Sequence, residues 1–280
     1  MNKILVIKTM TRQEVDTAID WAAVEGWNPG IHDADCFWRA DPTGFIGGWV
    51  ADEQVATISV VRYGRSFGFL GLYIVRPDFR GKGYGMQVWN AGLDYLEGRT
   101  VGLDGVPAQQ DNYHKSGFTP AWNNARYEGR GGGDAVSGTI PLKSVSREEL
   151  IDYDRQFFAE PRDGFLECWI SRPGTQALGA LHDGRLAGYG VTRRCLNGYK
   201  IGPLFADRPE IAEDLLVSLK AGIPESEAVF LDIPLSNAEA FALVERHGMH
   251  PVFETARMYR GKAPHISVAR TYGITSFELG

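Results

Sequence analysis

The chain has 280 residues, about twice the ~100 to 150 residues of a typical domain, so we expect two domains of similar size rather than one. Hydrophobic residues make up 44% of the chain and charged residues 23%, which excludes disorder as its main state. The balance of 35 acidic and 29 basic side chains gives a net charge of -6, without the basic surplus of a nucleic-acid binder. We therefore expect no nucleic-acid partner.

The three cysteines, Cys36, Cys168 and Cys195, are an odd number, and their spacing is typical of neither a zinc site nor a disulfide framework. We therefore expect no metal and a reducing compartment. The apolar run near the amino terminus is too short for a signal peptide, and no run approaches the ~20 apolar residues of a membrane span. The expectation is a cytoplasmic protein that contacts no membrane.

The two halves of the chain carry the same order of sequence signals, which indicates an internal repeat. Each half opens with a short strand, a Thr or Ser helix cap and a helix start, at residues 5–16 and 140–152. A hairpin around a polar turn follows at residues 49–61 and 180–191. Each half then ends with a strand, a short helix, a glycine step and a last strand. The repeat predicts two copies of one mixed α/β fold.

A glycine-rich segment lies between the two halves. Residues 131–133 are three successive glycines, which favour neither helix nor strand, so we expect a linker at 130–138 between domains at 1–129 and 139–262. The remaining segment, 263–280, regains strand-forming alternation over residues 271–279. We expect it to add an edge strand to one of the domains.

A glycine loop between a strand and a helix is the most informative stretch. The strand ends at Pro77, the loop runs from Arg80 to Gly85, and the helix is expected to bury Met86, Trp89, Leu93 and Leu96 on one face. Glycines allow successive backbone N–H groups to converge, the helix adds its positive end, and the loop supplies two basic side chains. The pattern predicts a pyrophosphate site, and its glycine spacing fits neither a Rossmann fingerprint nor a P-loop.

The same loop resembles a known family signature. Val75, Pro77, Arg80, Gly83 and Gly85 follow the pattern Val-x-Pro-x-x-Arg-x-x-Gly-x-Gly, which resembles the acetyl-CoA-binding signature of the GNAT superfamily of N-acyltransferases. The resemblance implies two tandem α/β folds, each with a mixed, mostly antiparallel sheet flanked by helices. It also implies that acetyl-CoA, the co-substrate, is held by Ile74, Val75, Arg80, Gly81, Lys82, Gly83, Tyr84, Gly85 and Asn112. A backbone N–H of Ile74 or Val75 would polarise the thioester oxygen.

Two residues are candidates for proton transfer. Tyr113 lies four residues before Gly117, in a relaxed form of the family's Asn-x-x-x-x-Tyr-x-x-x-Gly-Phe region, and the resemblance implies that it is the general acid for the departing thiolate. Ordinary helix packing is the alternative. Asp104, at a strand end, is a candidate base or substrate anchor. Asp232 occupies the equivalent place in the other half, so a structural role for both carboxylates is the alternative.

The region after the first helix is where the resemblance places the acceptor site. It holds several polar side chains and two tryptophans that would form an aromatic wall for an amine or pack in the core: Glu25, Trp27, Asn28, His32, Asp35 and Trp38.

The second half lacks the features that would bind CoA. Residues 200–214 contain no glycine loop and carry acidic side chains where phosphates would approach, and Val244 stands where the first half has Tyr113. We expect residues 139–262 to be a degenerate copy.

The expected function is an N-acetyltransferase in the first half, which transfers an acetyl or short acyl group to a primary amine on a small molecule. Attack within one ternary complex needs no nucleophilic side chain, which agrees with the absence of a convincing triad. A non-catalytic acyl-CoA-binding sensor or scaffold is the alternative. The acceptor, the general base and a homodimeric state stay open.

Overall fold

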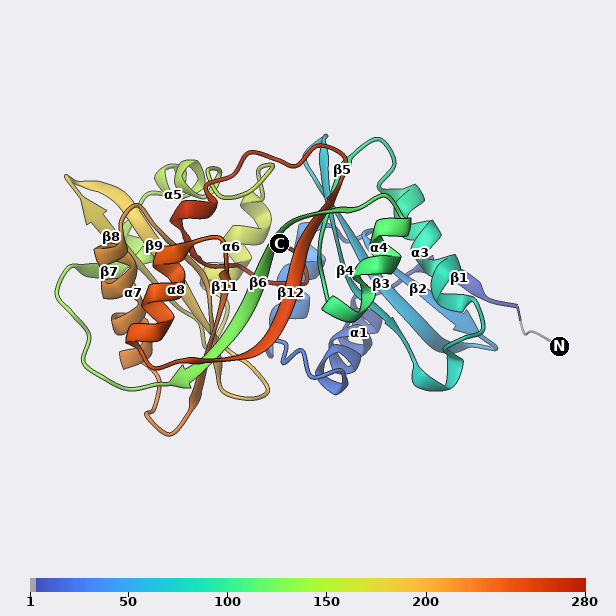
Figure 1. Cartoon of the computed structure of the whole chain (residues 1–280), viewed down its shortest axis with the longest axis horizontal. Coiled ribbons are helices and arrows are strands. Elements are labelled where there is room, and N and C mark those ends of the chain that lie inside the picture. The colour runs from blue at the N-terminus through green and yellow to red at the C-terminus, as the bar shows by residue number, and fades with distance from the viewer. Residues whose placement is uncertain (1–3) are drawn as a thin grey trace.

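The structure, a computed structural model, describes residues 4–280. Its thirteen described strands form one mixed, mostly antiparallel sheet flanked by helices (Figure 1). The strands of the first half are β1 (Val6–Thr9), β2 (Phe45–Val50), β3 (Glu53–Tyr63), β4 (Phe67–Val75), β5 (Thr100–Gly105) and β6 (Thr119–Arg130). Those of the second half are β7 (Thr139–Pro141), β8 (Gln176–His182), β9 (Arg185–Arg194), β10 (Tyr199–Ala206), β11 (Ala228–Pro234), β12 (His250–Arg260) and β13 (Thr271–Gly273).

Each half contributes four α-helices, and the 3-10 helices of the described chain are single short turns. The α-helices are α1 (Arg12–Val24), α2 (Asp33–Ala40), α3 (Tyr84–Tyr95), α4 (Gln110–Lys115), α5 (Arg147–Asp154), α6 (Asp163–Ser171), α7 (Pro209–Ala221) and α8 (Ala238–Arg246). The 3-10 turns are Pro77–Phe79, Pro107–Gln109, Leu142–Ser144 and Val268–Arg270.

The repeat read from the sequence is confirmed in the order and local chemistry of these elements. Thr11 caps α1 in a reciprocal capping box with Glu14, and Ser146 caps α5 by accepting a hydrogen bond from the Glu149 N–H. Both hairpins form, as β2–β3 and β8–β9. In each half one neighbouring pair of strands is parallel, β4–β5 and β10–β11, and the other described strand pairings are antiparallel.

The last strand of each half is exchanged with that of the other half. The sheet order is β5-β12-β6-β11, so β12 pairs with β5 of the first half and β6 pairs with β11 of the second. The long β6 and β12 run side by side through the middle of the molecule (Figure 1). The two halves therefore share a continuous sheet, and neither half completes its own sheet without the other.

Two buried ion pairs join the exchanged strands to their hosts. Arg257 of β12 donates two hydrogen bonds of 2.7 Å to the Asp104 carboxylate of β5. Arg126 of β6 donates two hydrogen bonds, of 2.7 and 2.9 Å, to the Asp232 carboxylate of β11. All four side chains are buried, and the pairs occupy equivalent places in the repeat. Each bidentate pair ties an exchanged strand to a strand of the half that hosts it.

The segment 263–280 does not form an edge strand, and that expectation is wrong. β13 pairs with β10 at Leu204 and Phe205, beyond the point where β10 and β11 separate, and the Ile274 N–H donates to the Asp232 carbonyl at 2.7 Å. The segment therefore fills the gap between β10 and β11. Residues 271–280 are all buried. The alternating sequence indicated extended structure, but only the open gap in the second half's sheet offered it backbone partners.

Although the cysteine spacing is not typical of a disulfide framework, Cys36 of α2 and Cys168 of α6 form a disulfide. The two residues are 132 positions apart, and the packing of α2 against α6, with Phe37 stacked on Trp169, brings them together. No sequence spacing could indicate such a pair. The pairing removes the basis for expecting a reducing compartment. Cys195 is a buried free thiol.

The disulfide predicts a definite thiol count. Protein unfolded without reductant should react with one maleimide per chain, at Cys195, and with three after reduction, as measured by mass spectrometry. Cys168→Ser should lower the free energy of unfolding by about 2–4 kcal/mol, because the crosslink restricts the unfolded chain. Cys195→Ser is the matched control. Three adducts without reductant would show that the disulfide is absent.

Candidate active site

A cleft opens where β4 and β5 separate. The two strands pair in parallel from Phe67 to Leu70 of β4 and then diverge. β4 also carries a bulge just beyond this point. Its register against β3 shifts there, and Leu72 has a φ of +45°. The cleft has a volume of about 360 Å³. It is lined by β4 from Leu70 to Val75, and by Glu25, Trp27, Arg80, Leu103, Asp104, Val106, Gln109, Tyr113, Phe253, Thr255, Phe277 and Glu278.

The predicted glycine loop follows this strand end. Gly81 and Gly83 have φ values of +71° and +79°, which favour glycine, and Gly83 is the N-cap of α3. Gly85 needs to be glycine for another reason, since a Cβ there would lie 2.6 Å from the Tyr73 hydroxyl oxygen. The loop thus brings the start of α3 against the end of β4, which is the geometry expected of a phosphate site.

The buried face of α3 differs from the expected one. Trp89 and Leu96 are buried and Leu93 is half-buried, but Met86 is 59% exposed. Val88 takes the place expected of Met86, because it faces β2, where its side chain fits against Gly48. The helical spacing of apolar residues was predicted correctly, but Met86 was wrongly assigned to the buried face of α3.

The basic side chains of the loop have partners within the protein. Arg80 donates a 2.8 Å hydrogen bond to the Val75 carbonyl and forms an ion pair with Glu25. Lys82 donates a 2.6 Å hydrogen bond to the Asp78 carbonyl. Both side chains are exposed, so phosphate oxygens could compete for them.

Asn112, also expected at the cofactor, lies away from the cleft lining. It is exposed on α4, where its amide donates a 2.8 Å hydrogen bond to Gln109. Gln109 lines the cleft, so Asn112 contacts a cleft residue without lining the cleft itself.

One backbone N–H at the strand end faces the cleft side of β4. The Arg76 N–H donates to the Val55 carbonyl of β3 at 3.0 Å. Because N–H groups alternate along a strand, Ile74 also directs its N–H toward β3, and Val75 directs its N–H toward the opposite edge. β5 does not pair with β4 at that edge beyond Leu70. Of the two expected donors, the geometry favours Val75.

Tyr113 reaches the cleft from α4. Its ring stacks on Trp89 at 5.6 Å and packs against Gly105, where a Cβ would collide with the ring. Burial, with a smaller contribution from the neighbouring Tyr73, raises the pKa of Tyr113 to about 12. A raised pKa keeps the phenol protonated throughout the neutral range, so it is available as a hydrogen-bond donor in the cleft.

Asp104 lines the cleft, but its carboxylate already has partners. Both oxygens accept from Arg257, and Oδ1 also accepts a 2.8 Å hydrogen bond from Asn124. The equivalent pair of Arg126 with Asp232 lies where β6 pairs with β11, in the part of the sheet that has no glycine loop. The geometry therefore favours the structural alternative for Asp104 over the role of base.

The loop after α1 reaches the cleft through two residues. Glu25 and Trp27 line it, and the Trp27 carbonyl accepts hydrogen bonds from Arg126 at 2.8 Å and from Lys200 at 3.1 Å. The other residues expected there do not line the cleft. Asn28 is hydrogen-bonded to Asn197, Asp35 accepts hydrogen bonds from Arg12, and Trp38 stacks on Phe45. His32 is exposed just before α2.

Sequence reasoning missed Phe277 and Glu278, which line the cleft from the far end of the chain. They lie more than 170 residues beyond the glycine loop. Nothing in their local sequence indicates a site, because only the path of segment 271–280 between the halves brings them there.

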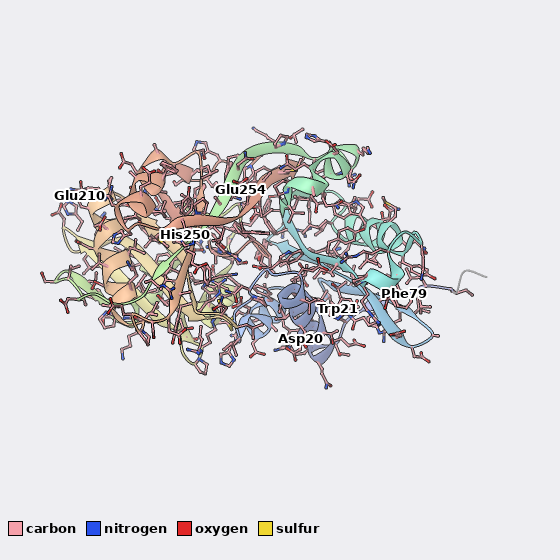
Figure 2. All side chains as sticks on the ribbon, turned by 60° about the horizontal axis from the view of Figure 1, so that its bottom comes forward. Asp20, Trp21, Phe79, Glu210, His250 and Glu254 are labelled. Atoms are coloured by element: carbon pink, nitrogen blue, oxygen red, sulfur yellow. A yellow bond between two sulfur atoms is a disulfide. The ribbon has the colours of Figure 1, made fainter. Side chains whose placement is uncertain are left out.

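The second half has no comparable cleft between β10 and β11, because β13 and Ile274 occupy that gap. Between β10 and α7 lie only Asp207 and Arg208, and Glu210 is in the first turn of α7 (labelled in Figure 2). Val244 is fully buried on α8. This half thus lacks the loop, the phenol and the open strand ends.

Within residues 4–280, no group of three or more His, Cys, Asp or Glu side chains is arranged to hold a metal ion. No helix of these residues is long and apolar enough to cross a membrane.

Comparison with known proteins agrees with this geometry. Residues 12–118 match the model of the acetyltransferase (GNAT) family, and residues 150–273 match a second model, the acetyltransferase (GNAT) domain. The chain is 32% identical to the holothin acyltransferase of Pseudoalteromonas sp. (strain SANK 73390) over 275 residues, covering 98% of this chain and 94% of the relative.

Two solved structures share the fold. A putative acetyltransferase from Pyrococcus horikoshii is 22% identical, with a TM-score of 0.84 over 99% of this chain and 96% of its own. A tandem GNAT protein from the clavulanic acid biosynthesis pathway is 16% identical, with a TM-score of 0.63 over 93% of this chain and 100% of its own. The chain belongs to the GNAT family of acyltransferases and carries two GNAT domains in tandem.

Proposed function

We propose that the cleft of the first half transfers an acetyl or short acyl group from acetyl-CoA to a primary amine on a small molecule. One observation carries the proposal: the free edge of β4, Arg80 of the glycine loop and the phenol of Tyr113, whose pKa is raised, line the same cleft. The relative named holothin acyltransferase spans nearly the whole chain and supports a small-molecule acceptor. The acyl group and the amine are our proposal.

Each chemical requirement has a residue in this arrangement. The loop from Gly81 to Gly85, with Arg80 and Lys82, would bind the pyrophosphate, and Tyr84 would contribute through its place in the first turn of α3. The Val75 N–H would donate to the thioester oxygen as negative charge develops there. Tyr113 would donate to the departing sulfur. The bulge of β4 would hold the thioester beside the amine, so that proximity supplies much of the rate.

We also propose a division of labour between the halves. Residues 1–129 would bind CoA, and residues 139–262, joined through the linker at 130–138, would support the site without binding CoA. The exchanged strands and the filled gap between β10 and β11 support this assignment. The sensor or scaffold alternative is less well supported, because binding alone requires no phenol in the cleft.

Tyr113→Phe tests the proposed chemistry. The substitution removes the hydroxyl and keeps the ring stacked on Trp89, so acetyl-CoA affinity should be unchanged while amine-dependent CoA release falls roughly 10²–10⁴-fold. Because the Tyr113 pKa is about 12, wild-type activity should show no decline from this group between pH 7 and about 10. CoA release is measured with a thiol reagent. Full turnover in the variant would contradict the role of Tyr113, and no transfer by the wild type to a broad amine panel would favour the sensor.

A further inference from the structure

Three carboxylates line the cleft, and they differ in what they contact. Glu25 forms an ion pair with Arg80, and Asp104 is held by Arg257 and Asn124. Glu278 has no such partner. The residue is only 4% exposed, and its buried Oε2 accepts no hydrogen bond. A buried carboxylate oxygen without a donor is costly, so its presence beside a cleft indicates that a ligand supplies the donor.

The fold holds Glu278 in place from both sides. Its carbonyl lies so close to Gly71 of β4 that a Cβ on Gly71 would collide with it. The next residue is held as well: the Leu279 N–H donates to the Ser276 hydroxyl at 3.1 Å, and the Tyr63 hydroxyl donates to the Leu279 carbonyl at 3.2 Å. The segment is therefore anchored directly at the β4 bulge, where the acyl group would lie.

Three basic side chains lie close enough to Glu278 to interact with its charge, but none of them donates a hydrogen bond to it. Arg126, Arg193 and Lys200 interact with it electrostatically. Each donates its hydrogen bonds elsewhere: Arg126 to Asp232 and Trp27, Lys200 to Trp27, and Arg193 to Asp33 and Thr275.

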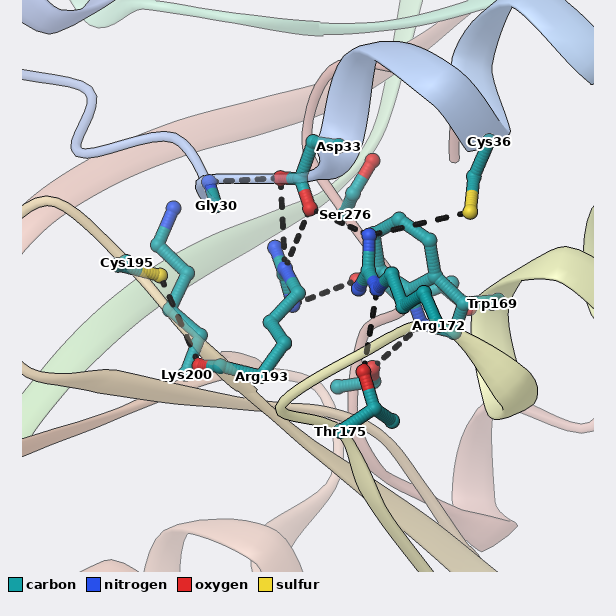
Figure 3. Close-up of polar contacts among 12 residues, drawn as sticks. Gly30, Asp33, Cys36, Trp169, Arg172, Thr175, Arg193, Cys195, Lys200 and Ser276 are labelled. Carbon is teal, nitrogen blue, oxygen red and sulfur yellow. Dashed lines mark hydrogen bonds and ion pairs between the residues drawn. The ribbon is translucent and has the colours of Figure 1, made fainter.

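The acidic neighbours belong to these same pairs. Asp33 is fully buried between the halves and is shared by Arg172 and Arg193, as Figure 3 shows. Asp232 is taken by Arg126. Of the three carboxylates that line the cleft, Glu278 is the one that forms no ion pair with a basic side chain.

Resting on the proposed function, we propose that Glu278 receives the acceptor amine and is its general base. An alkylammonium ion carries three N–H donors, and the Glu278 carboxylate, which lines the cleft, accepts one of them. The proton passes from nitrogen to the carboxylate and on to solvent, which frees the nitrogen lone pair. The C–N bond forms, the C–S bond breaks, Tyr113 protonates the sulfur, and the second proton lost from nitrogen restores the phenol.

Glu278→Gln keeps the size of the side chain and removes its ability to take a proton. At neutral pH, transfer to benzylamine, which is protonated there, should fall roughly 10²–10⁴-fold. Transfer to aniline, which is already neutral, should fall less than about tenfold, because it needs no initial deprotonation. The benzylamine rate of the variant should rise with pH in proportion to the free amine, whereas the wild-type rate should depend on pH much less steeply.

A binding measurement tests the same residue without turnover. With CoA bound, calorimetric titration with benzylammonium chloride should give an affinity at least about tenfold lower for Glu278→Gln than for wild type, because a charge-assisted hydrogen bond is lost. Glu254→Gln is the matched control: Glu254 is exposed on β12 (labelled in Figure 2), between the cleft-lining Phe253 and Thr255 but on the other face of the strand. It should behave as wild type.

The outcomes separate the two proposals. Equal loss with both amines, or unchanged transfer and binding in Glu278→Gln, would overturn the role of Glu278 and leave the proposed function intact. Benzylammonium binding that depends on Glu278, without transfer by the wild type to either amine, would support the amine site and contradict the proposed acyl transfer. A wild-type protein that does not bind benzylammonium would overturn the inference.

Discussion

Acetyl-CoA should bind this protein with one site per chain, and Gly83→Val should weaken that binding by at least about 100-fold. Gly83 has a φ of +79° at the N-cap of α3, a conformation that a β-branched residue adopts only at considerable cost. The loop must therefore shift, and the N–H groups that converge on the pyrophosphate would no longer do so. Isothermal titration calorimetry gives both the stoichiometry and the affinity.

Gly98→Val is the matched control for this experiment. Gly98 has a φ of +78° with no atom within 4 Å of an added Cβ, as at Gly83, but it lies in the turn after α3, away from the cleft. The two variants should lose similar free energy of unfolding, and only Gly83→Val should lose acetyl-CoA. Two sites per chain would show that the second half also binds CoA. Equal affinity in both variants would remove the loop from the proposed site.

Arg257→Met should lower the free energy of unfolding by about 3–5 kcal/mol, measured by urea denaturation. The substitution leaves the Asp104 carboxylate buried beside an apolar side chain, without the guanidinium that neutralised it. Since Arg257 lies on β12 and Asp104 on β5, the loss falls on the pairing of an exchanged strand with its host. Both halves should unfold in one transition, because they share the sheet.

The double variant Asp104→Asn/Arg257→Met tests the cause of that loss. Removing the unpaired charge should recover a large part of the stability, which a merely lost contact would not allow. The single variant Asp104→Asn should also retain most of the acyl-transfer activity if the carboxylate is structural. A loss of activity as large as that of Tyr113→Phe, in a stably folded protein, would restore Asp104 as a catalytic candidate.

Local chemistry was readable from the sequence wherever it depended on neighbouring residues. The caps at Thr11 and Ser146, the hairpin turns and the glycines before α3 are set by interactions within a few positions. The internal repeat added a comparison within the chain, which identified Val244 as the residue in place of Tyr113. The same comparison raised the structural alternative for Asp104.

Features that depend on which segments meet could not be read in this way. The exchange of β6 and β12, the disulfide between α2 and α6, and the path of residues 271–280 join positions far apart in the chain. The local sequence of a strand that is buried on both faces does not indicate which strands lie beside it, because its backbone N–H and C=O groups are the same whichever strand pairs with it.

The sequence by itself determined the family, the repeat, and the loop and phenol of one half, because these follow from residue types at fixed short spacings. The tertiary structure decided that the halves share one sheet, that Asp104 is engaged by Arg257, and that Glu278 reaches the cleft with an unpartnered oxygen. Each of these depends on long-range packing, which brings together groups whose chemistry is visible in the sequence but whose partners are not.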